Sequence, residues 1–192
     1  MPLMILRIVS SLLVALILGI GSAWIATGPL VMQYPLKNGA WRTSANLGNK
    51  GDEMYLRAYS ARIAWFSNDP DRSIYWVAEE DSTGAPLDGN CAYTISGRAI
   101  AARWWSITAY RNLHWVANSE NRYSFANTNI KTAPDGSWVI DASAAKQGEN
   151  WLPLGESGGR VSFVLRLYDP ADALFNDIGA MDVPAITKGA CK

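Results

Sequence analysis

The sequence predicts a mainly β protein: an antiparallel, jelly-roll-like β-sandwich with one flanking α-helix, preceded by a transmembrane helix. Three observations indicate this fold class. No charged residue occurs between Arg7 and Lys37. From residue 73 onward, short segments with period-two alternation of apolar and polar residues are separated by turns rich in glycine and aspartate. No helical patterns alternate with these segments, which favours a sandwich over a parallel sheet.

The uncharged N-terminal stretch is long enough to be a membrane span. Residues 8–32 are predominantly apolar, and a bilayer core needs about 20 such residues. The alternative is a secretory signal, with Arg7 as its basic region and Gly21-Ser22-Ala23 as its cleavage site. An uncleaved anchor is favoured because apolar character continues past the roughly 7–15 residues of a signal core. With Arg7 on the cytoplasmic side, the rest of the chain lies outside the cytoplasm.

The remaining elements follow in order along the chain. We divide it into residues 1–33 (anchor or signal), 34–50 (a polar linker) and 51–192 (one β-sandwich domain). Residues 52–66 predict a helix, because Asp52 is a suitable N-cap and apolar residues recur at helical spacing. Six strands are expected after it, at residues 73–78, 90–96, 103–110, 121–126, 137–142 and 160–168.

Cysteine usage agrees with an extracytoplasmic domain. The two cysteines, Cys91 and Cys191, form no C-x-x-C or Cys/His cluster that would indicate zinc. In an oxidising compartment they can pair, and closing a loop of about 100 residues would contribute about 4–5 kcal/mol. The alternative is one buried and one exposed thiol. We expect the disulfide.

Charge and composition exclude some function classes. Seventeen basic and seventeen acidic residues balance to zero, so nothing indicates a nucleic-acid partner. Nine tryptophans and eight tyrosines are many for 192 residues. Aromatic side chains at this density indicate a well-filled core, a binding face, or both.

Catalytic motifs are mostly absent. His114 is the single histidine, which excludes a multi-histidine metal site, and its apolar neighbours suggest a structural loop or core role. The glycine-rich segment at residues 155–159 lacks both the lysine and the following helix of a phosphate-binding loop. Two carboxylates suffice for a glycosidase, and the clusters present are Glu79-Glu80-Asp81 and Asp169 with Asp172. We expect the first to face water and Asp169 to cap a short helix, and we predict no catalytic residue, metal or cofactor.

Alternation on two strands predicts a candidate binding face. Side chains at positions 104, 106, 108 and 110 point to one side of their strand, opposite the apolar Trp105, Ile107 and Ala109. Arg166 and Tyr168 likewise lie opposite an apolar side. If the two strands are neighbours, they line a shallow groove suited to sugar rings, carboxylates or aromatic small molecules. Its members would be Trp104, Tyr110, Arg166 and Tyr168. The alternative is a solvated face, or one covered by the predicted helix.

Two loop segments allow both a functional and a structural interpretation. Arg122 could clamp an anionic ligand through both of its terminal nitrogens, or it could hold loop carbonyls in place. The run Asn150-Trp151-Leu152-Pro153 favours a structural corner, with Trp151 closing one end of the sandwich.

Several sequence blocks, in order, resemble the family called domain of unknown function 1214. They are residues 87–90 with Tyr93, residues 105–110, 121–124, 150–153 and 165–170, and the closing proline segment at 184–186. The resemblance covers about residues 55–186. It implies a jelly-roll-like sandwich in a secreted or envelope setting and no established reaction. Members of that family often carry a companion domain, domain of unknown function 1254, where this chain has its membrane segment.

Together these features predict a binding or assembly module of the bacterial envelope. It would be a single-pass protein of the inner membrane, held by residues 8–32, with its C-terminal domain in the periplasm. Its ligand would be a small molecule or a glycan. The alternatives are a carboxylate-based hydrolase or lyase acting on such a ligand, and a structural subunit that docks onto a membrane-protein partner.

Overall fold

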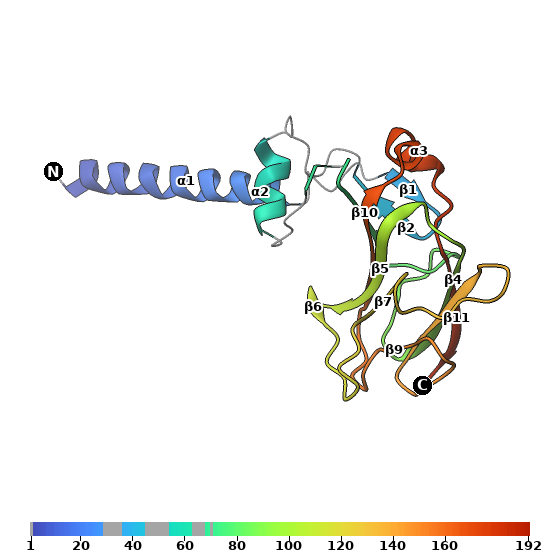
Figure 1. The fold of residues 1–192 in the computed structure, drawn as a ribbon. Helices are drawn as coiled ribbons and strands as arrows, with labels where there is room; N and C mark the ends of the chain where they lie inside the picture. Colours follow the sequence, from blue (N-terminus) through green and yellow to red (C-terminus); the bar gives the residue numbers. More distant parts are fainter. Residues whose placement is uncertain (1, 29–35, 45–53, 63–67, 70) are drawn as a thin grey trace.

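A long helix and a two-layered β domain make up the protein in the computed structural model, which describes residues 2–28, 36–44, 54–62, 68–69 and 71–192 (Figure 1). Helix α1 (Pro2–Ala26) projects away from the β domain. Its segment Leu3–Ala26 is apolar and long enough to cross a membrane, and none of it is buried in the protein. This helix is therefore a membrane anchor or a signal segment.

The predicted flanking helix is present as α2 (Met54–Arg62). Asp52 and Phe66, the predicted ends, lie outside the described residues. The Arg62 guanidinium donates to the carbonyls of Trp24 (3.2 Å) and Thr27 (3.5 Å) and lies 3.4 Å from the centroid of the Trp24 ring. A cation stabilises these terminal carbonyls of α1. None of the α2 side chains is buried, so α2 does not form a layer over either sheet.

Seven strands form the larger sheet, and every pair in it is antiparallel. In spatial order they are β1 (Leu36–Asn38), β2 (Trp41–Thr43), β3 (Ser73–Ala78), β10 (Ser162–Pro170), β5 (Ala102–Arg111) and β6 (His114–Trp115). Strand β7 (Ser124–Ala126) also pairs with β5. Strand β10 therefore lies at the centre, between β3 and β5.

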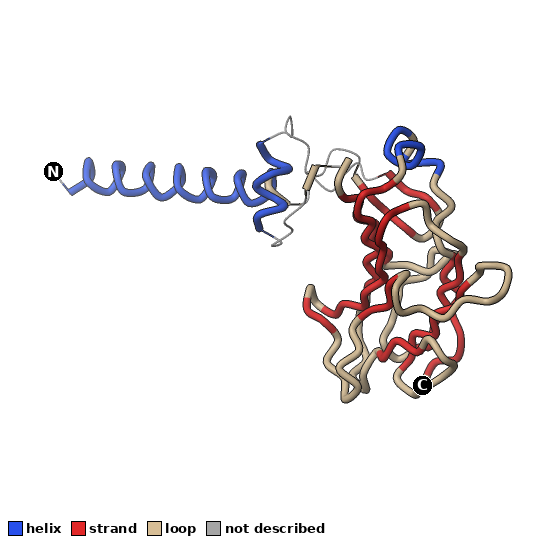
Figure 2. Tube along the Cα trace, in the orientation of Figure 1, coloured by secondary structure: helices blue, strands red, loops and turns tan. Residues whose placement is uncertain are grey.

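The smaller sheet has four strands, in the order β11 (Ala185–Cys191), β4 (Cys91–Gly97), β8 (Trp138–Ser143) and β9 (Trp151–Pro153). Its β8–β9 pair is parallel and is the exception to the antiparallel arrangement. Helix α3 (Asp172–Asn176) and a 3₁₀ turn (Ile178–Ala180) connect β10 to β11. Figure 2 shows the strands as two layers.

The core lies between the two sheets and confirms the mainly β, sandwich-like prediction. Trp105, Ile107 and Ala109 of β5 are buried, as their alternation predicted. The ring of Trp105 lies 4.9 Å from that of Trp138 on the smaller sheet. Apolar burial between two such faces is the main stabilising contribution in a sandwich.

The six predicted strands are all present, although the one at 121–126 is reduced to β7. The structure adds β1, β2, β6, β9 and β11. The first four have two or three residues each, too few to display alternation. Residues 36–43, within the predicted linker, form the β1–β2 hairpin, in which Trp41 is fully buried.

The predicted disulfide is present. Cys91 and Cys191 are bonded and face each other across β4 and β11. The bond closes a chain segment of 100 residues and attaches the last strand to the domain. Disulfides persist in oxidising compartments, so this one favours an extracytoplasmic location.

Candidate functional site

The side of the larger sheet opposite the core gathers the residues that alternation predicted, and Tyr75, Ser106 and Thr108 on this side are themselves buried. Strand register places Tyr168 opposite Trp104, and Arg166 between Ser106 of β5 and Tyr75 of β3. Directly opposed residues share a face of the sheet. We call the resulting surface the aromatic face. It consists of Tyr75, Trp104, Thr108, Tyr110, Arg166 and Tyr168.

Arg166 lies at the centre of the aromatic face and is half-buried. Its guanidinium donates to the Tyr110 hydroxyl at 2.5 Å and to Thr108 Oγ1 at 3.2 Å. It also lies 5.4 Å from the Tyr110 ring centroid and 6.0 Å from that of Tyr75. A guanidinium has five N–H donors, and the bonds to these two described residues account for two of them. Among the described residues, no carboxylate forms an ion pair with Arg166.

Tyr168 connects the two ends of the aromatic face. Its ring lies 5.4 Å from that of Trp104 and meets the Tyr75 ring edge-on at 6.4 Å. Burial, and then the hydrogen bond with Tyr75, raise the pKa of Tyr168 above its ordinary value. The hydrogen bond that raises the pKa is one that the neutral phenol donates, so it links Tyr168 to Tyr75.

Alternation within the two predicted strands missed some aromatic residues of this region, beginning with Trp115 and its partner Tyr123. Trp115 of β6 donates through Nε1 to the Tyr110 hydroxyl at 3.2 Å. Its ring stacks on Tyr123, with 5.3 Å between centroids. Tyr75 was missed as well. Tyr75 is buried like its neighbours Ile74 and Trp76 but lies on the other side of β3, and only the β3–β10 pairing brings it beside Arg166.

Arg122 lies apart from the aromatic face. Its guanidinium lies 4.8 Å from the ring centroid of Phe125, a buried residue. Its backbone N–H and carbonyl are both hydrogen-bonded to the side chain of Asn118. The Asn118 side chain thus holds the loop backbone here, while the Arg122 guanidinium packs on a ring. Among the described residues, no hydrogen bond or ring contact joins Arg122 to the aromatic face.

The first carboxylate cluster is engaged in structural contacts. Glu80 pairs with Lys37 and with Arg42. The hydrogen bond with Lys37 is the main cause that lowers the pKa of Glu80. Asp81 is buried rather than facing water as predicted. It accepts hydrogen bonds from the Thr83 hydroxyl (2.6 Å), the Thr83 N–H (2.8 Å) and the Ala85 N–H (3.1 Å), so it holds a turn.

The second carboxylate cluster is also structural. Asp169 pairs with Arg103 at 2.6 Å and Arg72 at 3.6 Å, and it adopts a left-handed φ of +45°. The prediction that Asp169 caps a helix was wrong: Ala171 is the N-cap of α3, with no side-chain cap bond. His114 lies exposed on β6 rather than in the core. In the described part of the chain, no three His, Cys, Asp or Glu residues form a group that could hold a metal ion.

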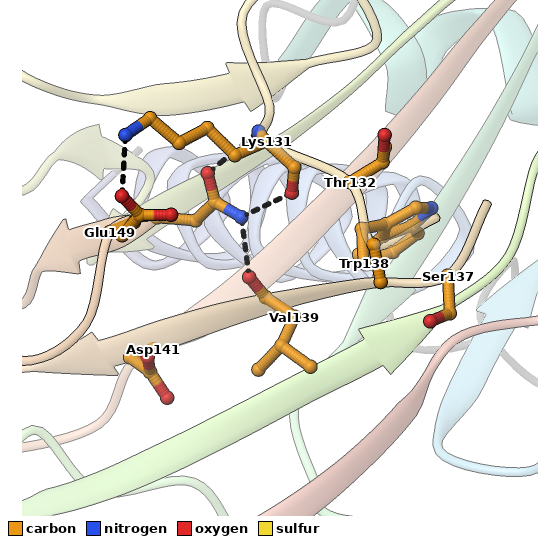
Figure 3. Close-up of a pocket in the computed structure, with 9 residues that line it drawn as sticks. Lys131, Thr132, Ser137, Trp138, Val139, Asp141 and Glu149 are labelled. Atoms are coloured by element: carbon orange, nitrogen blue, oxygen red, sulfur yellow. Dashed lines mark hydrogen bonds and ion pairs between the residues drawn. The ribbon is translucent and has the colours of Figure 1, made fainter. Parts of the chain in front are cut away.

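A separate cavity of about 330 Å³ lies beside β8 (Figure 3). The Asn150 amide is committed there: its oxygen accepts from the Lys131 N–H, and its nitrogen donates to the carbonyls of Lys131 and Val139, each at 2.8 Å. Lys131 also pairs with Glu149 at 2.6 Å. Asn150 and Lys131 are therefore bonded to neighbours in the cavity wall, which agrees with the structural role expected for residues 150–153.

The class of protein that these features define is a disulfide-bonded β-sandwich behind an apolar N-terminal helix, with an arginine on an aromatic sheet face. The chain belongs to the family described as "Protein of unknown function (DUF1214)", which residues 72–172 match. Every member of the aromatic face lies within the matched residues.

Two solved structures are similar to this chain. The chain is similar to the VPA0106 protein from Vibrio parahaemolyticus, with 26% identity and a TM-score of 0.60 over 73% of this chain and 36% of that one. It also matches an uncharacterized protein from Burkholderia cenocepacia (17% identity, TM-score 0.44, 88% of this chain and 40% of that one). The chain thus spans well under half the length of each structure. No curated protein matches it.

Proposed function

We propose that this chain is a membrane-anchored binding module outside the cytoplasm, and that its ligand site is the aromatic face. The ligand would carry a carboxylate beside a ring, as an acidic sugar does. The module would sit in the bacterial inner membrane through residues 8–32, with its β domain in the periplasm. The apolar helix α1 and the Cys91–Cys191 disulfide support this location.

The observation that carries the proposal is the state of the Arg166 guanidinium. Tyr110 and Thr108 fix its orientation, while the remaining N–H donors have no carboxylate partner among the described residues. A pre-oriented guanidinium suits a planar carboxylate through two parallel hydrogen bonds. The neighbouring rings of Trp104 and Tyr168 offer flat apolar surfaces on which a sugar ring can stack.

A thermal-shift screen of the full-length chain in lipid nanodiscs tests the proposal. The probes are glucuronic and galacturonic acid oligosaccharides, their neutral counterparts, and aromatic carboxylates. A ligand at 100 times its dissociation constant adds about 2.7 kcal/mol, which is several degrees for a domain of this size.

Arg122, which lies apart from the aromatic face, provides the matched control variant. Arg166→Gln should abolish the shift while changing the melting temperature of the free protein little, and Arg122→Gln should leave the shift intact. A shift that survives Arg166→Gln, or no shift with any acidic probe, would contradict the proposal.

A further inference from the structure

The β5–β6 turn places two large apolar side chains in solvent. Leu113 is 73% exposed and Trp115 is 62% exposed. Both turn residues, Asn112 and Leu113, have left-handed φ angles, of 49° and 66°. Asparagine tolerates this conformation, but for leucine it is sterically unfavourable. Because Leu113 gains no burial within the domain, folding alone gives no reason for a leucine at this position.

The apolar helix brings a bilayer within reach of this turn. Nine residues lie between the end of α1 at Ala26 and the start of β1 at Leu36. Even fully extended, the ten Cα–Cα steps from Ala26 to Leu36 span only about 35 Å. Figure 1 shows β6 projecting from the β domain on the side from which α1 leaves. A membrane that contains α1 would therefore lie on the side of the domain where Leu113 and Trp115 are exposed.

The chemistry of the turn matches the headgroup region of a bilayer. Tryptophan is enriched there because its ring is apolar while its N–H remains hydrogen-bonded, as that of Trp115 is to Tyr110. Arg122, next to the Tyr123 ring that stacks on Trp115, is exposed and can face lipid phosphates. The exposed carboxylate of Glu120, two residues before Arg122 in the sequence, carries the opposite charge.

We propose that the β5–β6 hairpin inserts Leu113 and Trp115 into the outer headgroup region of the bilayer that α1 spans. This inference rests on α1 being an anchor, which is part of the proposed function. The contact would orient the whole domain. Since Trp115 bonds to Tyr110, and Tyr110 to Arg166, the aromatic face would open close to the membrane surface.

Fluorescence quenching in vesicles tests this insertion. The full-length chain would be reconstituted in phosphatidylethanolamine and phosphatidylglycerol vesicles, with an environment-sensitive dye on single introduced cysteines. The native cysteines are bonded to each other, so they leave no competing thiol. The three variants are Leu113→Cys at the turn, Leu13→Cys inside α1, and Val139→Cys on the smaller sheet as a control that is 43% exposed.

Nitroxide-labelled lipids should quench the dyes at positions 113 and 13 several-fold more than the dye at 139. Quenching at 13 without quenching at 113 would refute the hairpin contact and leave the anchor standing. A blue-shifted dye at 113 that nitroxide lipids do not quench would mean that a protein surface covers the turn, which also refutes the proposal. An unquenched dye at 13 would remove the anchor and this inference together.

Discussion

Single residues decide what the aromatic face can bind. Alternation placed Trp104, Tyr110, Arg166 and Tyr168 on one side of their strands, and the structure brings these four together. The hydrogen bonds that fix Arg166 could not be predicted, because they depend on the register between β10 and β5. Register is set by long-range pairing and by turn geometry, neither of which is visible within one strand.

A buried carboxylate gives a residue-scale prediction on pH. The hydrogen bond from the Thr83 hydroxyl is the main cause that lowers the pKa of Asp81 below its ordinary value. A lowered carboxyl pKa stabilises the fold fully above the unfolded-state value of about 3.9, and this stabilisation is lost as pH falls through the folded pKa. Asp81→Asn should therefore lower the free energy of unfolding by about 1–3 kcal/mol at pH 7, and by clearly less at pH 3.

Urea unfolding at the two pH values measures this difference. Asp135→Asn is the matched control, because Asp135 makes the same kind of turn with Ser137 at an exposed position. Its replacement should have the smaller effect at pH 7. If Asp81→Asn lowers the free energy of unfolding equally at both pH values, the charge of Asp81 does not contribute to stability.

A glycine packed against a buried tryptophan gives a second residue-scale prediction. A Cβ atom at Gly97 would lie 2.5 Å from Cζ2 of Trp138, whose ring packs between the sheets. Gly97→Ala should therefore cost about 1–3 kcal/mol through overpacking, measured as a lower urea midpoint. At Gly189 the nearest atom would be 3.4 Å away. Gly189→Ala should lie close to wild type, and equal effects at both sites would contradict the packing argument.

At the scale of elements, length and exposure limited prediction. Strands of six or more residues with a buried side, such as β3 and β10, could be predicted from alternation. Strands β1, β2, β6 and β9 could not, because two or three residues display no period. Strand β11 has seven residues, but they are largely exposed and include Lys188 and Gly189, so their sequence is not typical of a strand.

The disulfide gives the element-scale prediction. Strand β11 lies at an edge and pairs with β4 alone, so the Cys91–Cys191 bond is its covalent attachment to the sheet. Reduction should lower the stability of the domain by about 4–5 kcal/mol. It should also speed amide hydrogen exchange in β11 more than in β3. If the rate of amide hydrogen exchange in β11 is unchanged after reduction, then pairing with β4 is enough to hold β11 in the sheet.

At the scale of the whole molecule, the sequence predicted the overall architecture better than it predicted the role of individual surfaces. The uncharged N-terminal stretch, the paired cysteines and the succession of short strands indicated the apolar helix, the disulfide and the two sheets. Composition could not predict the use of the face, because the same residues fit a solvated surface or a binding site. The structure adds a physical distinction: Arg166 is held by neutral hydroxyls, without a carboxylate partner in the described part of the chain.

The central claim is that the aromatic face recognises a carboxylate. The most direct measurement is calorimetric titration of the full-length chain in nanodiscs with an oligosaccharide of uronic acid and with its methyl ester, which differs by the lost charge. The account predicts that the acid binds at least tenfold more tightly than the ester, and that Arg166→Gln reduces the acid to the level of the ester. Equal affinities for the acid and the ester in the wild-type protein would contradict it.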